Sequence, residues 1–430
     1  MSAWKKVKIG DVFSIEKGSL QSSKNTAGKY DFITAASEWK THSSYDHDCE
    51  AIVYAVAASG SLGRAHYVNG KFIASDLCFI LTEKDKNKYP INFQFYQIVF
   101  EMMRDEIVSK TKTGTSKESI NRKNFANFEI PYFSIGFQQS NYQRFVESKR
   151  KVNELLEEYE KQKAYTKQLR ANILQDAIEG KLTADWREKH PLKKDDPDYD
   201  AEALFEKIQT KKQEKGKKQK TLPAITEAEK PFAIPTGWKW VRLGDVCDGF
   251  MYGTSAKSSN EGKCPVLRMG NIQNGKIDWE KLVFTNNDEE IQKYELKKFD
   301  LLFNRTNSRE MVGKTAIFES EQKTIYAGYL VRFRPILSNP YFINDVLNSK
   351  THREWCNEVK VDALGQSNIN AEKLKNFITP LPSLAEQKEI VARVEKHLET
   401  ITQLETQIAT RETLTKQLMQ GLLKDAFEEK

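Results

Sequence analysis

The chain lacks the sequence features that mark most enzymes and membrane proteins. It contains no HExxH, GxSxG or Walker A motif, and no D/NPPY or FxGxG signature of an adenine methyltransferase. No apolar run approaches the roughly 20 residues that a membrane span needs. The N-terminal sequence has no apolar core of a signal peptide. We therefore expect a cytoplasmic protein with no catalytic residue, no bound cofactor and no membrane partner.

Cysteine is scarce and scattered. The five cysteines show no CxxC spacing, so they are predicted to be small buried side chains in a reducing compartment. The stretch THSSYDHDCE gathers His42, Asp46, His47 and Asp48. Since no second ligand cluster at zinc spacing accompanies it, we interpret this stretch as a solvated loop and predict no metal site.

The composition indicates a folded protein with room for two or three domains. The 430 residues are 39% hydrophobic and 11% aromatic, which is enough to build a core in each half. The net charge is +7, and lysines crowd the stretch from Lys211 to Lys220, where Glu214 is the one acidic residue. This stretch is either a solvated linker or a segment that attracts phosphate.

The chain contains one long unit twice. The segment Trp4–Val12 (WKKVKIGDV) returns as Trp238–Val246 (WKWVRLGDV). Further along, Ile120-Asn121 returns as Ile369-Asn370, and the sequence Thr-Lys-Gln-Leu at 166–169 recurs unchanged at 415–418. A period this long predicts two whole domains, each followed by its own helix, and a partner that also has two related halves.

Both halves are predicted to be of mixed α/β character, so the fold class is α+β. Ala51–Val56 and Leu330–Phe333 have the composition of strands, whereas Asn92–Ser109 has helical spacing. We expect two α/β domains separated by two long antiparallel coiled-coil helices and related by a pseudo-two-fold axis. The expected boundaries are 1–136 for the first domain, 137–186 for the first helix, 187–235 for a Lys/Pro-rich linker, 236–381 for the second domain and 382–430 for the second helix.

Heptad repeats predict the two long helices and the seam between them. In the first helix, the a positions fall at Phe145, Val152, Tyr159, Thr166 and Ile173, with d positions at Leu155 and Leu169. In the second, Val394, Ile401, Ile408, Thr415 and Leu422 hold the a positions, and Ile390, Leu404 and Leu418 the d positions, with His397 in the same register. A helix of this length requires a partner, so we expect the two helices to pack together.

Donor-rich loops are the candidate binding features. Arginine, asparagine and glutamine side chains suit the edges of guanine and adenine, although the same loop residues also favour ordinary turns. The candidate DNA-binding residues of the second half are Tyr252, Thr254, Ser255, Lys257, Arg268, Asn271, Gln273, Asn304, Arg305, Asn307 and Ser308. Those of the first half are Lys24, Ser61, Arg64, Lys112, Thr115 and Lys117.

Three passages resemble the specificity (S) subunit of type I restriction–modification systems. Ile173–Glu188 (ILQDAIEGKLTADWRE) resembles the end of its central conserved helix, Lys230–Val246 the entry to its second target-recognition domain, and Ile378–Leu398 the opening of its distal conserved helix. The first half carries a divergent copy of that opening, in which Ala385-Glu386-Gln387 becomes Phe137-Gln138-Gln139. This departure makes the local helix cap of the first half uncertain.

The resemblance implies a non-catalytic subunit that reads double-stranded DNA. In that family, two target-recognition domains each read one half of a split, asymmetric sequence, and the helices fix the spacer. Two methyltransferase (M) subunits and motor-nuclease restriction (R) subunits are the expected partners, with S-adenosylmethionine, ATP and magnesium bound by those partners. The alternatives are a specificity subunit of another phage-defence system and a free-standing DNA-binding protein.

Overall fold

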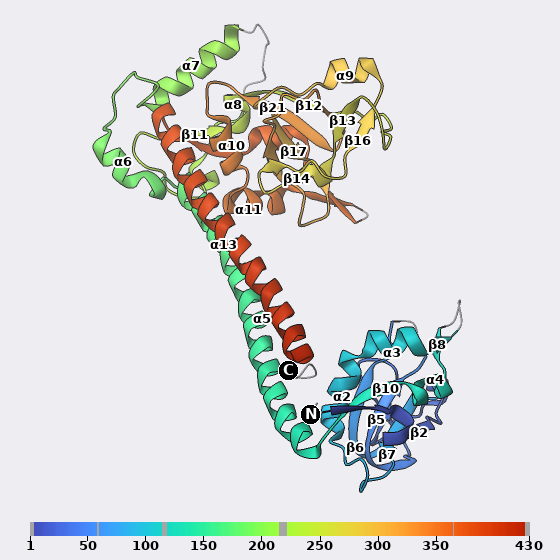
Figure 1. The fold of residues 1–430 in the computed structure, drawn as a ribbon. Helices are drawn as coiled ribbons and strands as arrows, with labels where there is room; N and C mark the ends of the chain where they lie inside the picture. Colours follow the sequence, from blue (N-terminus) through green and yellow to red (C-terminus); the bar gives the residue numbers. More distant parts are fainter. Residues whose placement is uncertain (1–3, 58–59, 114–117, 215–221, 364, 426–430) are drawn as a thin grey trace. The chain divides into compact units, whose positions relative to one another are not determined.

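The computed structural model describes residues 4–57, 60–113, 118–214, 222–363 and 365–425. The chain divides into two compact units (Figure 1). Unit 1 comprises residues 1–160 with 409–430, and unit 2 comprises residues 161–408. Each unit therefore contains one α/β domain together with a portion of both long helices.

Unit 1 is built on a six-stranded sheet of order β2-β7-β5-β6-β3-β4. The pair β3–β6 is parallel, and the other neighbours are antiparallel. Its elements are β1 (Trp4–Lys8), α1 (Ile9–Val12), β2 (Phe13–Lys17), η1 (Ser22–Lys24), β3 (Tyr30–Ile33), β4 (Lys40–His42), β5 (His47–Ala55), β6 (Ala65–Ala74), β7 (Cys78–Glu83), α2 (Phe93–Met102), α3 (Arg104–Thr111), β8 (Lys112–Thr113), β9 (Ser119–Ile120), α4 (Arg122–Asn127), β10 (Glu129–Phe133) and the first part of α5 (Ile135–Ile178).

The central strand β5 explains why this sheet is buried on both faces. Ile52 and Tyr54 point into a cluster formed with helices α2, α3 and α4, whereas Val53 and Ala55 point into a second cluster on the opposite face. All four side chains are fully buried. The successive apolar residues of β5 therefore fill two cores, since side chains alternate across a strand.

Unit 2 has a four-stranded sheet of order β12-β21-β17-β19 and several smaller sheets. Its main core also takes in side chains from the end of α5 and the start of α13. Its elements are the end of α5, η2 (Lys181–Thr183), α6 (Ala184–Lys189), α7 (Ala201–Glu214), η3 (Glu227–Glu229), β11 (Lys239–Arg242), α8 (Leu243–Val246), β12 (Cys247–Tyr252), β13 (Cys264–Leu267), η4 (Met269–Asn271), β14 (Ile272–Gln273), β15 (Lys276–Ile277), β16 (Val283–Thr285), α9 (Asp288–Tyr294), β17 (Leu301–Asn304), β18 (Thr306–Asn307), β19 (Thr315–Ile317), β20 (Ile325–Tyr326), β21 (Leu330–Pro335), α10 (Pro340–Val346), α11 (Lys350–Val359), β22 (Val361–Ala363), β23 (Gln366–Asn368), α12 (Ala371–Asn376), β24 (Ile378–Leu381) and α13 (Leu384–Asp425).

The stretch expected as a linker is partly built into unit 2. Within it, α7 buries Leu204 and Ile208 completely in the main core. The Lys212 ammonium at the end of α7 donates hydrogen bonds to the backbone carbonyls of Gly244 and Asp245. Most of the lysine-rich stretch that follows, residues 215–221, lies outside the described residues.

The sequence repeat corresponds to a structural repeat. In unit 1, β1 pairs antiparallel with β10, and in unit 2 β11 pairs in the same way with β24. A short helix follows the first strand of each domain. The first residue of that helix donates a backbone hydrogen bond to the residue just before the last strand of the domain. The Ile9 N–H donates to the Phe128 carbonyl at 2.9 Å, and the Leu243 N–H donates to the Phe377 carbonyl at 2.8 Å. The predicted duplication is therefore confirmed down to individual backbone contacts.

The two long helices run antiparallel within each unit. In unit 2, Arg170 on α5 donates a hydrogen bond to Glu405 on α13 (Figure 1). In unit 1, the Tyr159 hydroxyl shares a hydrogen bond of 3.2 Å with the Thr415 hydroxyl. The predicted a positions are buried at Val152, Tyr159 and Thr166 on α5 and at Val394, Ile401, Ile408 and Thr415 on α13.

Most of the predicted d positions do not form a seam, which corrects the sequence-based expectation. Leu155 and Leu169 on α5, and Leu404 and Leu418 on α13, are each 41% exposed or more. His397 is also exposed, whereas Ile390 is fully buried in the core of unit 2. The two helices therefore contact each other along a stripe of a positions and leave a second row of leucines uncovered.

A buried glutamine at the start of each long helix ties that helix to its domain. The Gln138 amide donates to the carbonyls of Phe133 and Pro90, and its oxygen accepts from the N–H of Asn92, the N-cap of α2. Gln387 repeats this pattern on the Pro382 carbonyl and on the N–H of Asn339, the N-cap of α10.

The uncertainty about the helix cap of the first half is resolved, because Gln138 corresponds to Gln387 and makes the same contacts, while Phe137 corresponds to Glu386. The two halves differ at the position occupied by Phe137 in the first half and by Glu386 in the second. Phe137 stacks on Phe133 with ring centroids 4.6 Å apart. Glu386 is a buried carboxylate that accepts hydrogen bonds from three groups, the Thr183 hydroxyl, the Arg187 guanidinium and the Trp238 indole.

We predict that Gln138→Ala lowers the free energy of unfolding by about 1–3 kcal/mol, because the substitution leaves buried backbone groups of Asn92 and Phe133 without partners. Urea unfolding of the full chain measures the effect. The matched control is Gln139→Ala, which truncates an exposed glutamine one residue further along the same helix. Equal stability losses in the two variants would contradict the assignment.

Candidate nucleic-acid interface

Arg305 is the best-positioned of the predicted binding residues. Its guanidinium carbon lies 4.7 Å from the centre of the Tyr252 ring, a cation–π arrangement. Its Nη atoms donate to the Gly328 carbonyl at 3.5 Å and to the Asn368 side-chain oxygen at 3.4 Å. These long contacts hold the guanidinium in place, and Tyr252 remains 41% exposed. Each Nη atom of Arg305 carries two N–H groups and uses one of them here, so the guanidinium retains donor capacity.

The loop that follows Arg305 is braced by a neighbouring hairpin. Strand β18 pairs with β23, and β23 pairs with β22. At the hairpin, Asp362 accepts a hydrogen bond from the Ser367 hydroxyl at 2.5 Å and pairs with Arg309 at 2.7 Å. The Ser367 hydrogen bond and then Arg309 lower the pKa of Asp362, so the bracing carboxylate is ionised at neutral pH. The loop carrying Asn307 and Ser308 is thus held at both ends.

Three of the predicted binding residues serve the domain interior and are not retained as candidates. Asn271 is 4% exposed, accepts from the Arg268 N–H and donates to the carbonyls of Asp278 and Glu280. Asn304 is fully buried, and Thr254 is buried with its hydroxyl donated to Glu290. Their residue types suit base recognition, but their side chains are buried and inaccessible to a ligand.

The remaining candidates of unit 2 are accessible. Ser255 and Lys257 are exposed on the loop after β12. Arg268 is exposed as well, and its guanidinium donates to the Lys281 carbonyl at 3.2 Å. Gln273 accepts a hydrogen bond of 2.9 Å from the Lys314 ammonium.

The candidates of unit 1 lie in three separate places. Lys24 is exposed in η1. The Arg64 guanidinium donates to the Ala35 carbonyl and to the Ser61 hydroxyl, which fixes that loop. Lys112, on β8, pairs with Glu118 at 2.7 Å. Thr115 and Lys117 lie outside the described residues.

Because it pairs with β18 beside Arg305, the hairpin β22–β23 is a candidate binding element that the sequence-based prediction missed. In unit 1 the short hairpin β8–β9 ends on the repeated Ile120, and in unit 2 β22–β23 ends directly before its copy, Ile369. The first of these hairpins was predicted to bind through Lys112, Thr115 and Lys117. Transferring that prediction to the equivalent segment of the second half would have identified hairpin β22–β23.

Cys356 and His352 approach each other but do not form a reactive pair. The thiol sulfur lies 3.5 Å from the His352 Nε2. Burial raises the pKa of Cys356 to about 12 and lowers the pKa of His352 to about 3, so both are neutral near pH 7. Neither side chain is therefore activated. Over the described part of the chain, no group of three or more His, Cys, Asp and Glu residues is arranged to hold a metal ion.

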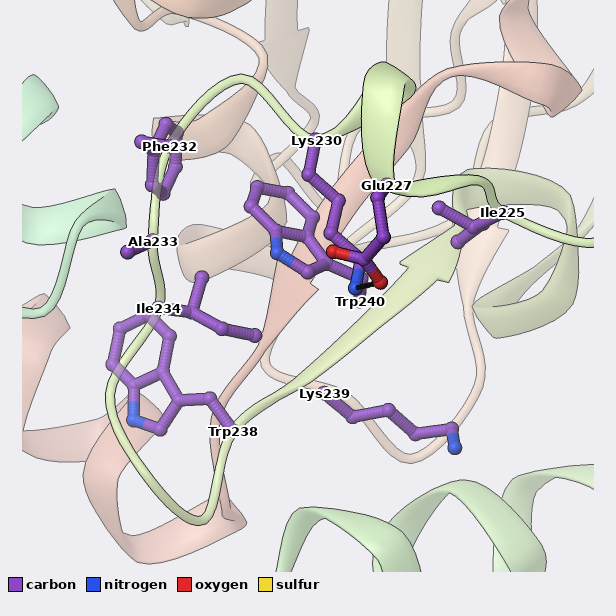
Figure 2. A pocket seen from close by; sticks show the side chains of 9 residues that line it. All are labelled: Ile225, Glu227, Lys230, Phe232, Ala233, Ile234, Trp238, Lys239 and Trp240. Carbon is purple, nitrogen blue, oxygen red and sulfur yellow. Dashed lines mark hydrogen bonds and ion pairs between the residues drawn. The ribbon is translucent and has the colours of Figure 1, made fainter.

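A pocket in unit 2 lies between the segment 225–234 and strand β11 (Figure 2). Phe232 and Trp240 line it with ring centroids 5.0 Å apart. Its charged groups are already neutralised, since Lys230 pairs with Glu227 and Lys239 pairs with Glu202 on α7. The pocket therefore offers aromatic surface without an uncompensated charge.

In the described residues, the model contains no helix that is both long and apolar enough to cross a membrane.

Comparison with known proteins places both halves in one family. A family model described as the type I restriction modification DNA specificity domain matches residues 1–164 and again residues 235–411. A putative type I restriction enzyme MjaX specificity subunit of Methanocaldococcus jannaschii is 32% identical over 205 residues, 46% of this chain and 48% of the relative. The type I restriction enzyme EcoEI specificity subunit of Escherichia coli is 28% identical over 255 residues, 56% of this chain and 41% of the relative. In both cases the alignment spans less than half of the relative's length.

The fold is also known from solved structures. A chain described under the structural basis of complex assembly and conformational transition of the type I R-M system aligns over 100% of this chain and 98% of its own length. The TM-score is 0.62 at 18% identity, a likeness that concerns the fold alone. With the specificity domain matched in both halves, the chain belongs to the type I restriction modification DNA specificity family.

Proposed function

We propose that the chain is the sequence-reading subunit of a type I restriction–modification complex and recognises a split, asymmetric DNA target. The observation that carries this proposal is the duplicated specificity domain, in which the same frame displays different loops in each half. The frame is shared at the strand pairs β1–β10 and β11–β24, whereas the loops that contain Arg64 and Arg305 differ in most of their residues. Two different readers on one chain fit a target with two unlike half-sites.

Within this proposal, Arg305 and the loop after it read base edges in unit 2. A guanidinium oriented against an aromatic ring suits a bidentate contact to guanine, and Asn307 and Ser308 lie next to it on the same braced loop. In unit 1 the corresponding candidates are Arg64 and Lys112, together with the exposed Lys24. The chain itself binds no cofactor, and S-adenosylmethionine, ATP and magnesium belong to its partners.

We further propose that the exposed leucines of the long helices are where two methyltransferase subunits dock. Leu169 and Leu418 occupy the same place in the repeated Thr-Lys-Gln-Leu and are both exposed, at 44% and 57%. Apolar side chains that recur at helical spacing and remain uncovered mark a protein-binding surface. Because the sites come from a repeat, two identical partners fit them, and restriction subunits join the resulting complex.

The proposal is tested by co-expressing the chain with the methyltransferase subunit of its host in a strain without adenine methylation. We expect two methyltransferase subunits per chain on purification, and sequencing should place methyladenine in one bipartite motif. A chain that purifies alone, yet binds one DNA site tightly, would support a free-standing DNA-binding protein instead.

Exchange of one domain should change one half-site only. Replacing residues 1–136 with the corresponding domain of a relative should alter one half of the methylated motif, because each frame carries its own loops. The matched control is the exchange of residues 236–381, which should alter the other half. If either exchange changed both halves together, the two domains would not read independently.

Helix length should influence the spacer between the half-sites. Duplicating the heptad that contains Thr-Lys-Gln-Leu in both helices adds two turns, about 10.5 Å, without shifting the buried a positions. That length corresponds to about three base pairs at roughly 3.4 Å each.

Because added base pairs also rotate the second half-site, we expect the spacer to change by about one to three pairs with weaker binding. Methylation mapping measures the spacer. A control with the heptad added to one helix alone should lose the matched packing and the activity. An unchanged spacer with full activity in the double insertion would show that the helices do not set it.

A further inference from the structure

Three cations that are not among the predicted binding residues lie on segments that pack together in unit 2. Lys314 directly precedes strand β19, Arg353 lies on helix α11, and Lys167 lies on helix α5. They are far apart in the sequence. None of them belongs to the lysine-rich stretch or to the loops that composition singles out.

A specific contact holds the helices of two of these cations together. The Gln175 side chain on α5 donates to the Thr351 hydroxyl of α11 at 2.9 Å and accepts from the Thr351 N–H at 3.2 Å. Arg353 follows two residues later, and its Nη1 donates to the Glu310 carbonyl at 3.2 Å. The end of the recognition loop, helix α11 and helix α5 are thus joined at this point.

The cations lack acidic partners. Throughout the described ranges, neither Lys314, Arg353 nor Lys167 forms an ion pair with a carboxylate, and the Arg353 Nη2 is buried without a hydrogen-bond partner. The Lys314 ammonium donates to the neutral amide of Gln273. Its pKa is lowered by burial first, and then by the positive charges of Arg353 and Lys167.

An arrangement of this kind is unfavourable unless an anion completes it. Like charges at close range repel, and a half-buried ammonium loses hydration that a neutral amide does not fully replace. A folded domain that nevertheless brings them together retains them for a ligand. An anion with several oxygen acceptors matches one guanidinium and two ammonium groups.

We propose that Lys314, Arg353 and Lys167 form a binding site for the phosphate backbone of duplex DNA. The inference rests on the proposed function, and it adds a site that fixes the position of the duplex without reading its sequence. The location of this site beside the proposed recognition loop favours a phosphate of the DNA backbone over a free anion. The loop that follows Arg305 and Asn307 passes through Glu310, whose carbonyl Arg353 binds, and ends at Lys314. A duplex that meets this loop therefore passes the three cations.

The test measures the affinity of the full chain for a duplex with its methylated motif and for an unrelated duplex, over a series of salt concentrations. Lys314→Gln and Lys167→Gln should each weaken both duplexes by about five- to tenfold, and leave the preference for the motif unchanged. The slope of log affinity against log salt should fall by about 0.9 for each phosphate contact that is lost. Lys314→Arg, which keeps the charge, should restore binding.

Two matched controls remove a lysine elsewhere in unit 2. Lys161→Gln alters an exposed lysine on α5, and Lys323→Gln alters an exposed lysine in the loop between β19 and β20. Both should keep the wild-type affinity and slope. Lys167 is exposed on its helix, so its variant tests the site even if Lys314→Gln disturbs folding.

Unchanged affinity and slope in both test variants would overturn the inference, as would a loss of preference at a single base pair. Titration with inorganic pyrophosphate distinguishes a site for the DNA backbone from a site for a small free anion. Pyrophosphate binding that Lys314→Gln abolishes, with DNA affinity intact, would show a small-anion site and overturn the DNA assignment. The proposed function fails separately, when the wild-type chain itself shows no preference for a bipartite motif.

Discussion

In each unit, the first strand of the domain pairs with the strand that immediately precedes a long helix. The pairings of β1 with β10 and of β11 with β24 bring the two ends of each domain together. The buried glutamines Gln138 and Gln387 then bind the first turn of the helix to the N-cap of another helix in the same domain. The direction in which each long helix leaves its domain is therefore set by main-chain geometry. The position of the helix seam and of the exposed leucines relative to each domain depends on that joint.

The fold could be predicted from the sequence to the extent that repetition and periodicity record it. The repeated segments located both domains, and the heptad spacing located the buried residues Tyr159 and Thr415. Heptad spacing did not show that Leu155 and Leu404 are exposed, because a leucine buried in a seam and a leucine left uncovered give the same sequence pattern. The contact of Glu386 with Thr183, Arg187 and Trp238 was also inaccessible, since it joins three segments that are distant along the chain.

The candidate site, too, could be predicted from the sequence only in part. Residue type selected Arg305, which contacts Tyr252 and keeps N–H groups without a protein partner, but it also selected Asn271 and Asn304, which are buried in the domain. Side-chain chemistry alone does not distinguish an amide that faces a base from one that satisfies buried carbonyls. The cations Lys314 and Arg353 were missed for the opposite reason. Neither belongs to a charged run, and only the packing of α11 against the recognition loop makes their charges act together.

The closing pair of each domain has a consequence for the order of events during synthesis on the ribosome. Domains generally fold as units, beginning with the N-terminal one. The first domain has all its strands once residue 133 has emerged, and the next few residues supply Gln138. In the second domain, β11 has no partner strand until β24 has been made. Thr183, Arg187 and Trp238 likewise lack their hydrogen-bond acceptor until Glu386 has been added. Helix α5 is likewise translated long before α13, so the side chains of α5 that pack on α13 face solvent on the nascent chain until α13 has been made.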